Sequence, residues 1–551
     1  MKNSFKLVLQ ILLVIALGGG SFFLALEMMD NLYTYRSPLS SDPPIPGQSF
    51  GKPVSERVVL VIVDALRYDT SMDAEVMPIL NQMRVQGASA MMHSQVPSYS
   101  SPGYSTLLTG AWPYLNDGPV FNIDYEEIKP FSQDNVFSSA KRFGLKTAAS
   151  GYNWFEKLIP SSALDIGYFT PLEDQSADRV VVDAAIPWLA SDDYNLILIH
   201  LDQVDYAGHH EGGPKSENWQ KAATRVDGLL AEIISELDFS KDTLIITADH
   251  GQIDQGGHGG QDDVTLVEPF VLVGKGVKSG AYEDVQMVDV APTISAFLGI
   301  NLPASTQGQV LTEMILLPQS TREGLKVETS RQQSQLLADY ATAIGQTLPE
   351  EATNASPSIS VEQYQGELIN LQKNRLNQER LIRFGISALV IIILLIILSR
   401  WKPKSWRKFT LAAILYSVLF HATYLTLGSK VYSYSVVDSP VQLVLSNGII
   451  SVSALAITWL LFSFQDWIAI DLKQNLIKVL NLSIFIMLVT ALPLIAHIVW
   501  DGLFASWILP DLRLHYLALL SMTQTFSMAI GVVLLMIITT IILISRKRKP
   551  A

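Results

Sequence analysis

The stretch ERVVLVIVDALR (residues 56–67) places six consecutive apolar residues, Val58–Val63, directly before Asp64. An uninterrupted apolar run of this length is typical of a strand that is covered on both faces, as in a parallel sheet. Further along the chain, short runs of the same kind occur at Lys146–Ala149, Leu196–Leu201, Leu244–Thr247 and Phe270–Val273. We expect these five runs to be strands of one sheet.

Helical stretches separate the runs. Trp219–Leu237, for example, repeats apolar residues at helical spacing from Val226 to Ile234, which predicts an amphipathic helix. Asp289–Leu298 (DVAPTISAFL) predicts a closing helix. Buried strands that alternate with helices predict an α/β fold, namely a doubly wound, largely parallel sheet covered on both sides.

The chain is more apolar at its two ends than in its middle. Hydrophobic residues make up 49% of the chain and the mean hydropathy is +0.27, which is high for a soluble protein. Near the N-terminus, Leu7–Met28 is apolar and follows Lys2 and Lys6. Such a segment is either a cleaved secretory signal or an uncleaved anchor. Because the apolar run is long and Gly18–Ser21 is a poor cleavage site, we expect an anchor over residues 1–29.

Five more apolar segments predict membrane-spanning helices at about 384–401, 409–428, 447–464, 476–500 and 515–544. Basic residues concentrate in the loop 400–408 and in Arg546–Lys549, and basic loops lie preferentially on the cytoplasmic side. With six spans in total, both termini are cytoplasmic and residues 30–380 lie outside. We therefore expect an integral protein of the cell membrane with an extracytoplasmic middle part.

The same composition shifts predict domain boundaries. Residues 30–55 include the Pro-, Ser- and Gly-rich string SPLSSDPPIPGQSFGKP (37–53) and are expected to form a linker. The α/β domain follows at 56–315. Residues 316–380 become polar and helix-prone, which predicts a helical connector next to the membrane. Residues 381–551 complete the chain as the transmembrane domain.

Charge and cysteine content exclude several functions. The chain carries 39 Lys and Arg against 52 Asp and Glu, and the acidic excess lies in residues 30–380. Such a field repels nucleic-acid phosphates, so we expect no nucleic-acid binding. The absence of cysteine excludes disulfides, thiolate chemistry and Cys-ligated zinc. Nothing in the sequence indicates an oligomeric state.

Acidic residues and histidines collect where the expected strands end. They are Asp64 after the first strand, Asp205 and His209 after LILIHL, and Asp249, His250 and His258 after LIITA. Each has a plainer interpretation by itself, since a strand-end Asp often caps a helix and His258 among glycines suits a loop. In an open α/β sheet, however, ligands bind beyond the carboxyl ends of the strands. We therefore expect these side chains to share one crevice.

The residue types in this crevice suit metal ions. Imidazole and carboxylate are ligands for zinc, with manganese as the alternative. Three Asp and three His are enough for two divalent ions. Two ions about 3.5–4 Å apart can stabilise both the attacking and the leaving oxygen of an in-line phosphoryl displacement. The pattern therefore predicts a two-metal phosphoryl-transfer enzyme.

The string VPSYSSPGYSTLLTG (96–110) offers a nucleophile. A serine at the start of a helix gains from the positive end of the helix dipole, and an adjacent metal can hold its oxygen as an alkoxide. Pro102 suits the first turn of such a helix. On composition alone, an ordinary capped helix N-terminus fits the string equally well.

Together the motifs resemble the alkaline phosphatase superfamily, in particular its type I phosphodiesterase/nucleotide pyrophosphatase branch, and they are similar to those of the GPI ethanolamine phosphate transferases. The resemblance covers roughly residues 56–315. It rests on VVLVIVDALR (58–67), SxPGYSTLLTG (100–110), DYAGHH (205–210), TADHG (247–251), His258 with its two following glycines, and DVAPTISAFLG (289–299).

The resemblance implies a ligand set. One metal ion would be held by Asp205, His209 and His258. The other would be held by Asp64, Asp249, His250 and the oxygen of the nucleophile Ser100.

The resemblance also selects the nucleophile among the serines. In the family it stands two residues before a proline and ten before the glycine of a Thr-Gly pair, which fits Ser100 with Pro102 and Gly110 but neither Ser98 nor Ser101. Many relatives have threonine there, and serine keeps the hydroxyl. Asn122, in PVFNIDY, lies one residue from where the family has an asparagine that binds a phosphoryl oxygen. The sulfatases share the implied fold but need an arginine where this chain has Tyr104, so a sulfatase is disfavoured.

The resemblance thus implies a membrane-bound two-metal phosphodiesterase or phosphoethanolamine-type transferase that forms a covalent phosphoseryl intermediate. Five additional spans are more than an anchor needs, which favours a phosphodiester substrate that is a lipid or a lipid-linked head group. One alternative is a cell-surface nucleotide pyrophosphatase/phosphodiesterase that acts on soluble substrates. The other is a non-catalytic membrane scaffold, which the intact set of seven ligand positions disfavours.

Overall fold

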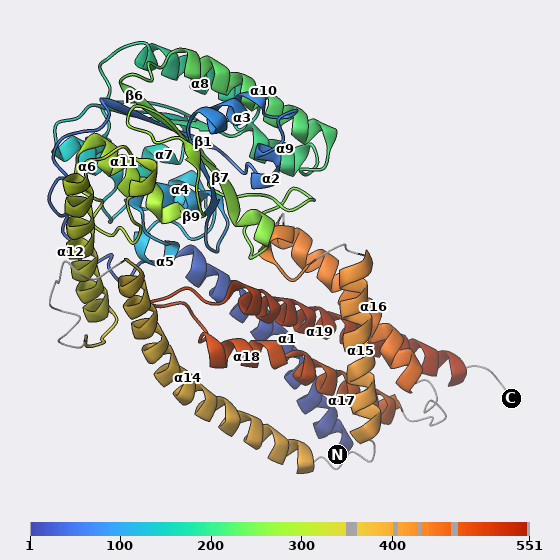
Figure 1. Cartoon of the computed structure of the whole chain (residues 1–551). Helices are drawn as coiled ribbons and strands as arrows, with labels where there is room; N and C mark the ends of the chain where they lie inside the picture. The colour runs from blue at the N-terminus through green and yellow to red at the C-terminus, as the bar shows by residue number, and fades with distance from the viewer. Residues whose placement is uncertain are drawn as a thin grey trace. The chain divides into compact units, whose positions relative to one another are not determined.

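The chain folds as two units. The computed structural model describes residues 2–348, 361–400, 406–427, 431–437, 439–463 and 472–547. One unit comprises Tyr33–Arg375 with Ser506–Leu509, and the other comprises Met1–Leu32, Leu376–Ala505 and Pro510–Ala551. The first unit contains the sheet and the second contains the long apolar helices (Figure 1).

The sheet of the first unit has nine strands in the order β4-β3-β5-β1-β6-β7-β2-β8, with β9 also paired to β2. The strands are β1 (Arg57–Val63), β2 (Ala88–His93), β3 (Thr147–Tyr152), β4 (Ile166–Thr170), β5 (Leu196–Leu201), β6 (Asp242–Thr247), β7 (Val267–Gly274), β8 (Gly280–Ala281) and β9 (Val285–Gln286). Only β7 runs antiparallel to its neighbours, β6 and β2. The prediction of a largely parallel sheet is confirmed.

Alternate side chains of β1 enter two different hydrophobic cores. Val58, Leu60 and Ile62 pack into one core and Val59, Val61 and Val63 into the other, and all six are buried. This alternation follows from the two-residue period of a strand. Because both faces of the strand are covered, the sequence shows an unbroken apolar run instead of an alternating one.

Helices cover both faces of the sheet (Figure 1). One core contains residues of α4 (Ser100–Thr109), α6 (Val136–Arg142), α7 (Phe155–Leu158) and α11 (Val290–Leu298). The other contains residues of α3 (Pro78–Gln86), α8 (Gln175–Leu189), α9 (Gln203–His210) and α10 (Glu217–Ser235). The remaining helices of this unit include α2 (Tyr68–Ser71), α5 (Pro113–Asn116) and α12 (Gln319–Ala343). The doubly wound arrangement is therefore confirmed.

All five predicted strands are present, as β1, β3, β5, β6 and β7, and the helices expected at 219–237 and 289–298 are present as α10 and α11. Two longer strands were not predicted. β2 has the sequence ASAMMH and alternates buried with half-buried residues, and the first three residues of the edge strand β4 are exposed. Neither strand contains the apolar run that marks a strand buried on both faces.

The strand order brings together the carboxyl ends of the three strands that precede the candidate site residues. β1 lies between β5 and β6 and is parallel to both. The carboxyl ends of these three strands therefore meet at one edge of the sheet. The residues after them (Asp64 after β1, Asp202–His210 after β5, and Asp249–His258 after β6) start from neighbouring positions.

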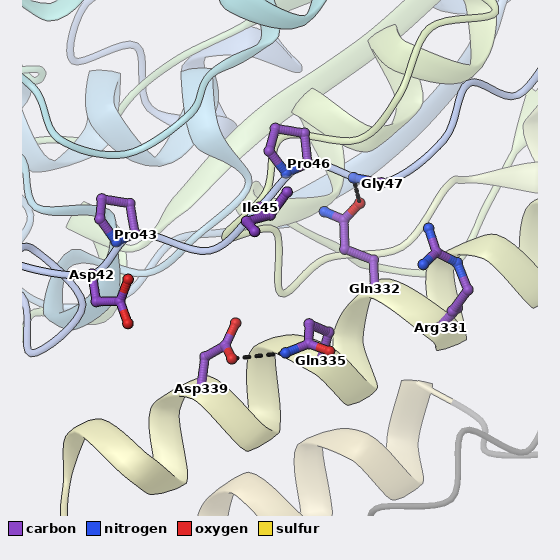
Figure 2. Close-up of a pocket in the computed structure, with 9 residues that line it drawn as sticks. All are labelled: Asp42, Pro43, Ile45, Pro46, Gly47, Arg331, Gln332, Gln335 and Asp339. Atoms are coloured by element: carbon purple, nitrogen blue, oxygen red, sulfur yellow. Dashed lines mark hydrogen bonds between the residues drawn. The ribbon is translucent and has the colours of Figure 1, made fainter.

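The predicted linker contacts α12. Figure 2 shows Asp42, Pro43, Ile45, Pro46 and Gly47 beside this helix, where they line a hollow of about 350 Å³ together with Arg331, Gln332, Gln335 and Asp339. The backbone N–H of Gly47 donates a hydrogen bond of 3.2 Å to Gln332 Oε1. No residue of the predicted metal site lines this hollow, so it is not part of that site.

The second unit consists of long apolar helices. They include α1 (Lys2–Tyr33), α14 (Val361–Arg400, which begins in the first unit), α15 (Trp406–Leu427), α16 (Pro440–Ser463), α17 (Leu472–Thr490), α18 (Leu492–Trp500) and α19 (Leu512–Lys547). Within the described residues, five segments are long and apolar enough to cross a membrane: Ser4–Tyr33, Trp406–Thr426, Pro440–Phe462, Leu472–Trp500 and Leu512–Ser545. The chain thus has the apolar helices of an integral membrane protein.

The span expected at 384–401 is not among these five segments. Residues 384–400 form the last part of α14, a continuous helix of 40 residues whose first part is polar. Residues 401–405, where this segment ends, lie outside the described part of the chain. The N-terminal apolar helix and four of the five C-terminal segments are therefore found.

We expect a buried ion pair at the amino end of the sheet to contribute to the free energy of unfolding. Arg57 Nε and Nη2 donate to the two oxygens of Asp242 at 3.0 and 2.5 Å, and both side chains are almost fully buried. Asp242→Ala leaves the guanidinium without its counter-ion and should lower the free energy of unfolding by about 3–5 kcal/mol. Denaturant unfolding of the full chain in detergent measures this loss.

The matched control is the exposed pair Lys221–Glu217, whose side chains are 60% and 81% exposed. Lys221→Ala should change the free energy of unfolding by less than about 1 kcal/mol. Equal effects of the two substitutions would contradict the prediction.

Candidate metal centre

A tight turn after β1 directs Asp64 towards Asp249 and His250. Ala65 follows with φ +58°, a left-handed conformation that costs a non-glycine residue roughly 1–2 kcal/mol. In this conformation the backbone N–H of Ala65 donates a hydrogen bond of 3.2 Å to Asp249 Oδ1. The turn therefore positions Asp64 directly and Asp249 through a hydrogen bond.

Three oxygens converge on one ring nitrogen of His250. Its Nε2 lies 3.2 Å from Ser100 Oγ, 3.3 Å from Asp249 Oδ2 and 3.4 Å from Asp64 Oδ1. The other ring nitrogen, Nδ1, lies 3.1 Å from the carbonyl oxygen of Gly251. A carbonyl only accepts hydrogen bonds, so Nδ1 carries the proton and Nε2 presents its lone pair to the three oxygens.

Ser100 is the first residue of α4, and Asn122 lies beside it. Asn122 Nδ2 donates to Ser100 Oγ at 3.4 Å, and the backbone N–H of Ser101 donates to Asn122 Oδ1 at 3.1 Å. The first turn of the helix thus fixes which end of the amide faces Ser100. Ser100 itself is 5% exposed.

A second group forms around His258. Its Nε2 lies 2.9 Å from His209 Nε2 and 3.4 Å from Asp205 Oδ1, and His209 Nε2 lies 3.5 Å from Asp205 Oδ2. His258 Nδ1 donates to the carbonyl oxygen of Ser98 at 3.1 Å, which again leaves Nε2 free of a proton. The rings of His250 and His258 stack with centroids 4.1 Å apart, so the two groups adjoin.

Asp64, Asp249, His250 and His258 are buried, and this changes their proton affinity. Burial raises the pKa of Asp64 and of Asp249 well above the usual range, and nearby carboxylates (Asp205 for Asp64, Asp64 for Asp249) add to the effect. Burial also lowers the pKa of His258 to about 4 and that of His250 well below its usual value. Without a cation, these surroundings favour protonated carboxyls and neutral histidines.

The donor set fits divalent metal ions. Asp64 Oδ1 and Asp249 Oδ2 are buried and have no hydrogen-bond partner, although buried polar atoms nearly always have one. Both lie beside the free lone pair of His250. Ligand atoms also converge in the sets Asp64–Asp249–His250 and Asp205–His250–His258. Metal ions bound here would supply the partners that these oxygens lack.

The structure places every predicted site residue at this edge of the sheet. It brings together Asp64, Asp249, His250 and Ser100 in one group and Asp205, His209 and His258 in the adjoining one. This is the division that the family resemblance implied, and the assignment of the residues as metal ligands stays a prediction. His209 is the most exposed of the three histidines, with 34% of its side chain accessible.

The sequence did not identify the side chains that form hydrogen bonds to the predicted metal ligands. Gln252 Nε2 donates to Asp205 Oδ1 at 2.7 Å, and Trp219 Nε1 donates to Gln252 Oε1 at 2.9 Å. Tyr104 and His200 both contact Asp64. The sequence assigns no role to His200 in the strand LILIHL, and Tyr104 enters only as the position where a sulfatase needs an arginine. The only sequence signal was the presence of polar groups in otherwise apolar elements.

Known proteins match the part of the chain that contains these two groups. Residues 58–264 match the family model described as type I phosphodiesterase / nucleotide pyrophosphatase, and all the residues discussed for the two groups lie within this range. The human GPI ethanolamine phosphate transferase 2 catalytic subunit is 25% identical over 313 residues, or 51% of this chain and 31% of its own length. GPI ethanolamine phosphate transferase 2 of Kluyveromyces lactis is 24% identical over 321 residues, or 51% of this chain and 39% of its own length. The chain thus spans about a third of the length of these curated relatives.

Solved structures match part of the chain. Murine ectonucleotide pyrophosphatase/phosphodiesterase 5 is 15% identical, and the match covers 45% of this chain and 96% of that one with a TM-score of 0.37. The wild-type alkaline phosphatase PafA is 14% identical, and the match covers 48% of this chain and 100% of that one with a TM-score of 0.38.

Metal loading should release protons. Because burial raises the pKa of Asp64 and Asp249, the metal-free site retains protons at a pH where exposed carboxyls are ionised, and a bound cation displaces them. The heat of zinc binding, measured at one pH in two buffers of different ionisation enthalpy, gives the number of protons released. Asp249→Asn should release fewer protons than the wild type, and identical heats in both buffers would contradict the prediction.

Proposed function

We propose that this chain is a membrane-bound, two-metal phosphotransferase that transfers a phosphoethanolamine-type head group through Ser100. The observation that carries the proposal is the convergence of Ser100 Oγ, Asp64 Oδ1 and Asp249 Oδ2 on His250 Nε2, within 3.2–3.4 Å. The similarity to GPI ethanolamine phosphate transferases and to the phosphodiesterase family supports the reaction class.

The metal ligands follow from the two groups. Asp64, Asp249, His250 and Ser100 would hold one ion, and Asp205, His209 and His258 the other. Imidazole and carboxylate ligands favour zinc, with manganese as the alternative. The ions would supply positive charge that favours ionised Ser100 and stabilises the phosphoryl and leaving oxygens.

Ser100 and Asn122 would perform the transfer. Ser100 Oγ attacks the phosphorus in line, and the bond between phosphorus and the departing alkoxide breaks, which leaves the phosphoryl group on Ser100. Asn122 Nδ2 lies 3.4 Å from Ser100 Oγ and can donate a hydrogen bond to a phosphoryl oxygen as negative charge develops on it. An acceptor hydroxyl, or water, then attacks the phosphoserine ester and restores Ser100.

The apolar helices favour a lipid or lipid-linked substrate. Four C-terminal segments in addition to the N-terminal one are long and apolar enough to span a membrane, and one anchor would suffice to hold a domain at a surface. We place the catalytic domain (56–315) outside the cytoplasm, between the linker (30–55) and the connector (316–380). This orientation, with both termini cytoplasmic, requires residues 384–401 to form a sixth span.

A nucleotide pyrophosphatase/phosphodiesterase acting on soluble substrates is the second candidate. The description of the matching family model favours it. The two functions predict that Ser100 takes its phosphoryl group from different substrates.

The test compares two phosphoryl-donor substrates of the purified full chain in lipid nanodiscs. With zinc bound, phosphatidylethanolamine should yield diacylglycerol and a phosphoethanolamine adduct on Ser100 that mass spectrometry locates, whereas a nucleotide pyrophosphate should react poorly. Ser100→Ala should lower the rate by at least about 10³-fold, as expected when a nucleophile is removed. Preferential cleavage of the nucleotide would support the second candidate.

Ser101→Ala is the matched control. It keeps the backbone N–H that binds Asn122 and removes a buried hydroxyl that has no hydrogen-bond partner. Its rate should stay within about twofold of the wild type. An equal loss in both variants, or full activity of Ser100→Ala, would show that Ser100 is not the nucleophile.

A further inference from the structure

The two oxygens of Asp64 have different surroundings. Oδ2 accepts hydrogen bonds from the hydroxyl of Tyr104 and from His200 Nε2, the latter at 3.0 Å. Oδ1 has no hydrogen-bond partner and lies 3.4 Å from His250 Nε2. Asp64, Tyr104 and His200 are each 1% exposed, so water does not compete for these contacts. One oxygen is thus held by the protein while the other faces the candidate metal position.

The backbone determines which nitrogen of His200 donates. The N–H of Tyr152 donates to His200 Nδ1 at 3.4 Å, so Nδ1 is an acceptor. The neutral ring then carries its proton on Nε2, which lies 3.0 Å from Asp64 Oδ2 and 2.8 Å from the hydroxyl of Tyr104. His200 is therefore arranged as a hydrogen-bond donor to Asp64, with no lone pair left for a metal.

Tyr104 lies on the helix that begins with Ser100. Residues separated by three or four positions share one face of a helix, which places Ser100, Gly103 and Tyr104 together on α4. Gly103 packs so closely on Asp249 that an added Cβ would lie 2.7 Å from its carbonyl oxygen and 2.9 Å from its Cβ. This face of α4 therefore contacts both aspartates that accompany His250, Asp64 through the hydroxyl of Tyr104 and Asp249 through Gly103.

We propose that Tyr104 and His200 are positioning residues that fix Asp64 as a ligand through one oxygen, and that Tyr104 couples this ligand to the helix carrying Ser100. This inference rests on the proposed function, because it needs a metal ion at Asp64, Asp249 and His250. Two neutral donors on Oδ2 keep the carboxylate from rotating, so that Oδ1 stays directed at the ion. Displacement of Asp64 would then shift the ion relative to Ser100.

A different arrangement of the same residues is testable in parallel. Atoms of Asp64, His200 and Asp202 also lie close enough together to hold an ion. In that case His200 would be a ligand of a third metal. The hydrogen bond from Tyr152 to His200 Nδ1 and the proton on Nε2 argue against this arrangement, and metal stoichiometry distinguishes the two.

The experiment titrates zinc into the metal-free full chain in detergent, against a chromophoric chelator. Tyr104→Phe and His200→Leu should still bind two ions at saturation, but one of them about tenfold more weakly, which is the usual effect of losing a contact to a metal ligand. His200→Gln should restore the affinity because its amide nitrogen can donate from the position of Nε2. The transfer rate at saturating substrate should fall with Tyr104→Phe while KM changes little.

Tyr114→Phe is the matched control, because it removes a tyrosine hydroxyl that accepts a 2.7 Å hydrogen bond from Gln307 rather than one in the metal groups. Its zinc titration should equal that of the wild type. If His200→Leu does not fold, Tyr104→Phe and His200→Gln still provide the comparison. Wild-type affinity in both Tyr104→Phe and His200→Leu would overturn the inference, and so would three ions in the wild type with two in His200→Leu. A wild-type protein that binds no metal would instead overturn the proposed function.

Discussion

Asp64, Asp205 and Asp249 lie together at one edge of the sheet because β5, β1 and β6 are adjacent and parallel. Asp64 follows β1 directly, Asp249 lies two residues after β6, and Asp205 lies in the first turn of α9 after β5. Burial raises the pKa of Asp64 and Asp249, and repulsion from the neighbouring carboxylates adds to the shift. The metal ions that we propose would supply the positive charge that offsets this repulsion, and the histidines and Ser100 lie where they could bind the same ions.

Each carboxylate has a protein donor that limits its motion. Oδ1 of Asp249 accepts from the N–H of Ala65, Oδ2 of Asp64 accepts from Tyr104 and His200, and Oδ1 of Asp205 accepts from Gln252. In Asp64 and Asp249 the second oxygen has no partner. Likewise, His250 and His258 each use Nδ1 to hold a backbone carbonyl and present Nε2. The protein thus fixes the orientation of the side chains and leaves the atoms that suit a cation free.

The sequence predicted the central strands of the sheet and the grouping of acidic residues and histidines at their ends because both depend on local patterns. An apolar run followed by Asp64 or by Asp249-His250 identifies a strand and its end without any knowledge of the fold. β2 and β4 escaped because half-exposed strands lack such a run. The contacts of Tyr104 and His200 with Asp64 join residues 40 and 136 positions apart, and no local pattern indicates them. Asn122 was placed through family resemblance, since nothing in the loop around it predicts its hydrogen bond to α4.

The positions of the metal ions test the proposed ligand sets. Crystals of the full chain grown with zinc and measured at the zinc absorption edge would locate every ion by anomalous scattering. We predict two peaks, one bound by Asp64, Asp249, His250 and Ser100, and one bound by Asp205, His209 and His258. A single peak, or a peak coordinated by His200, would contradict this prediction.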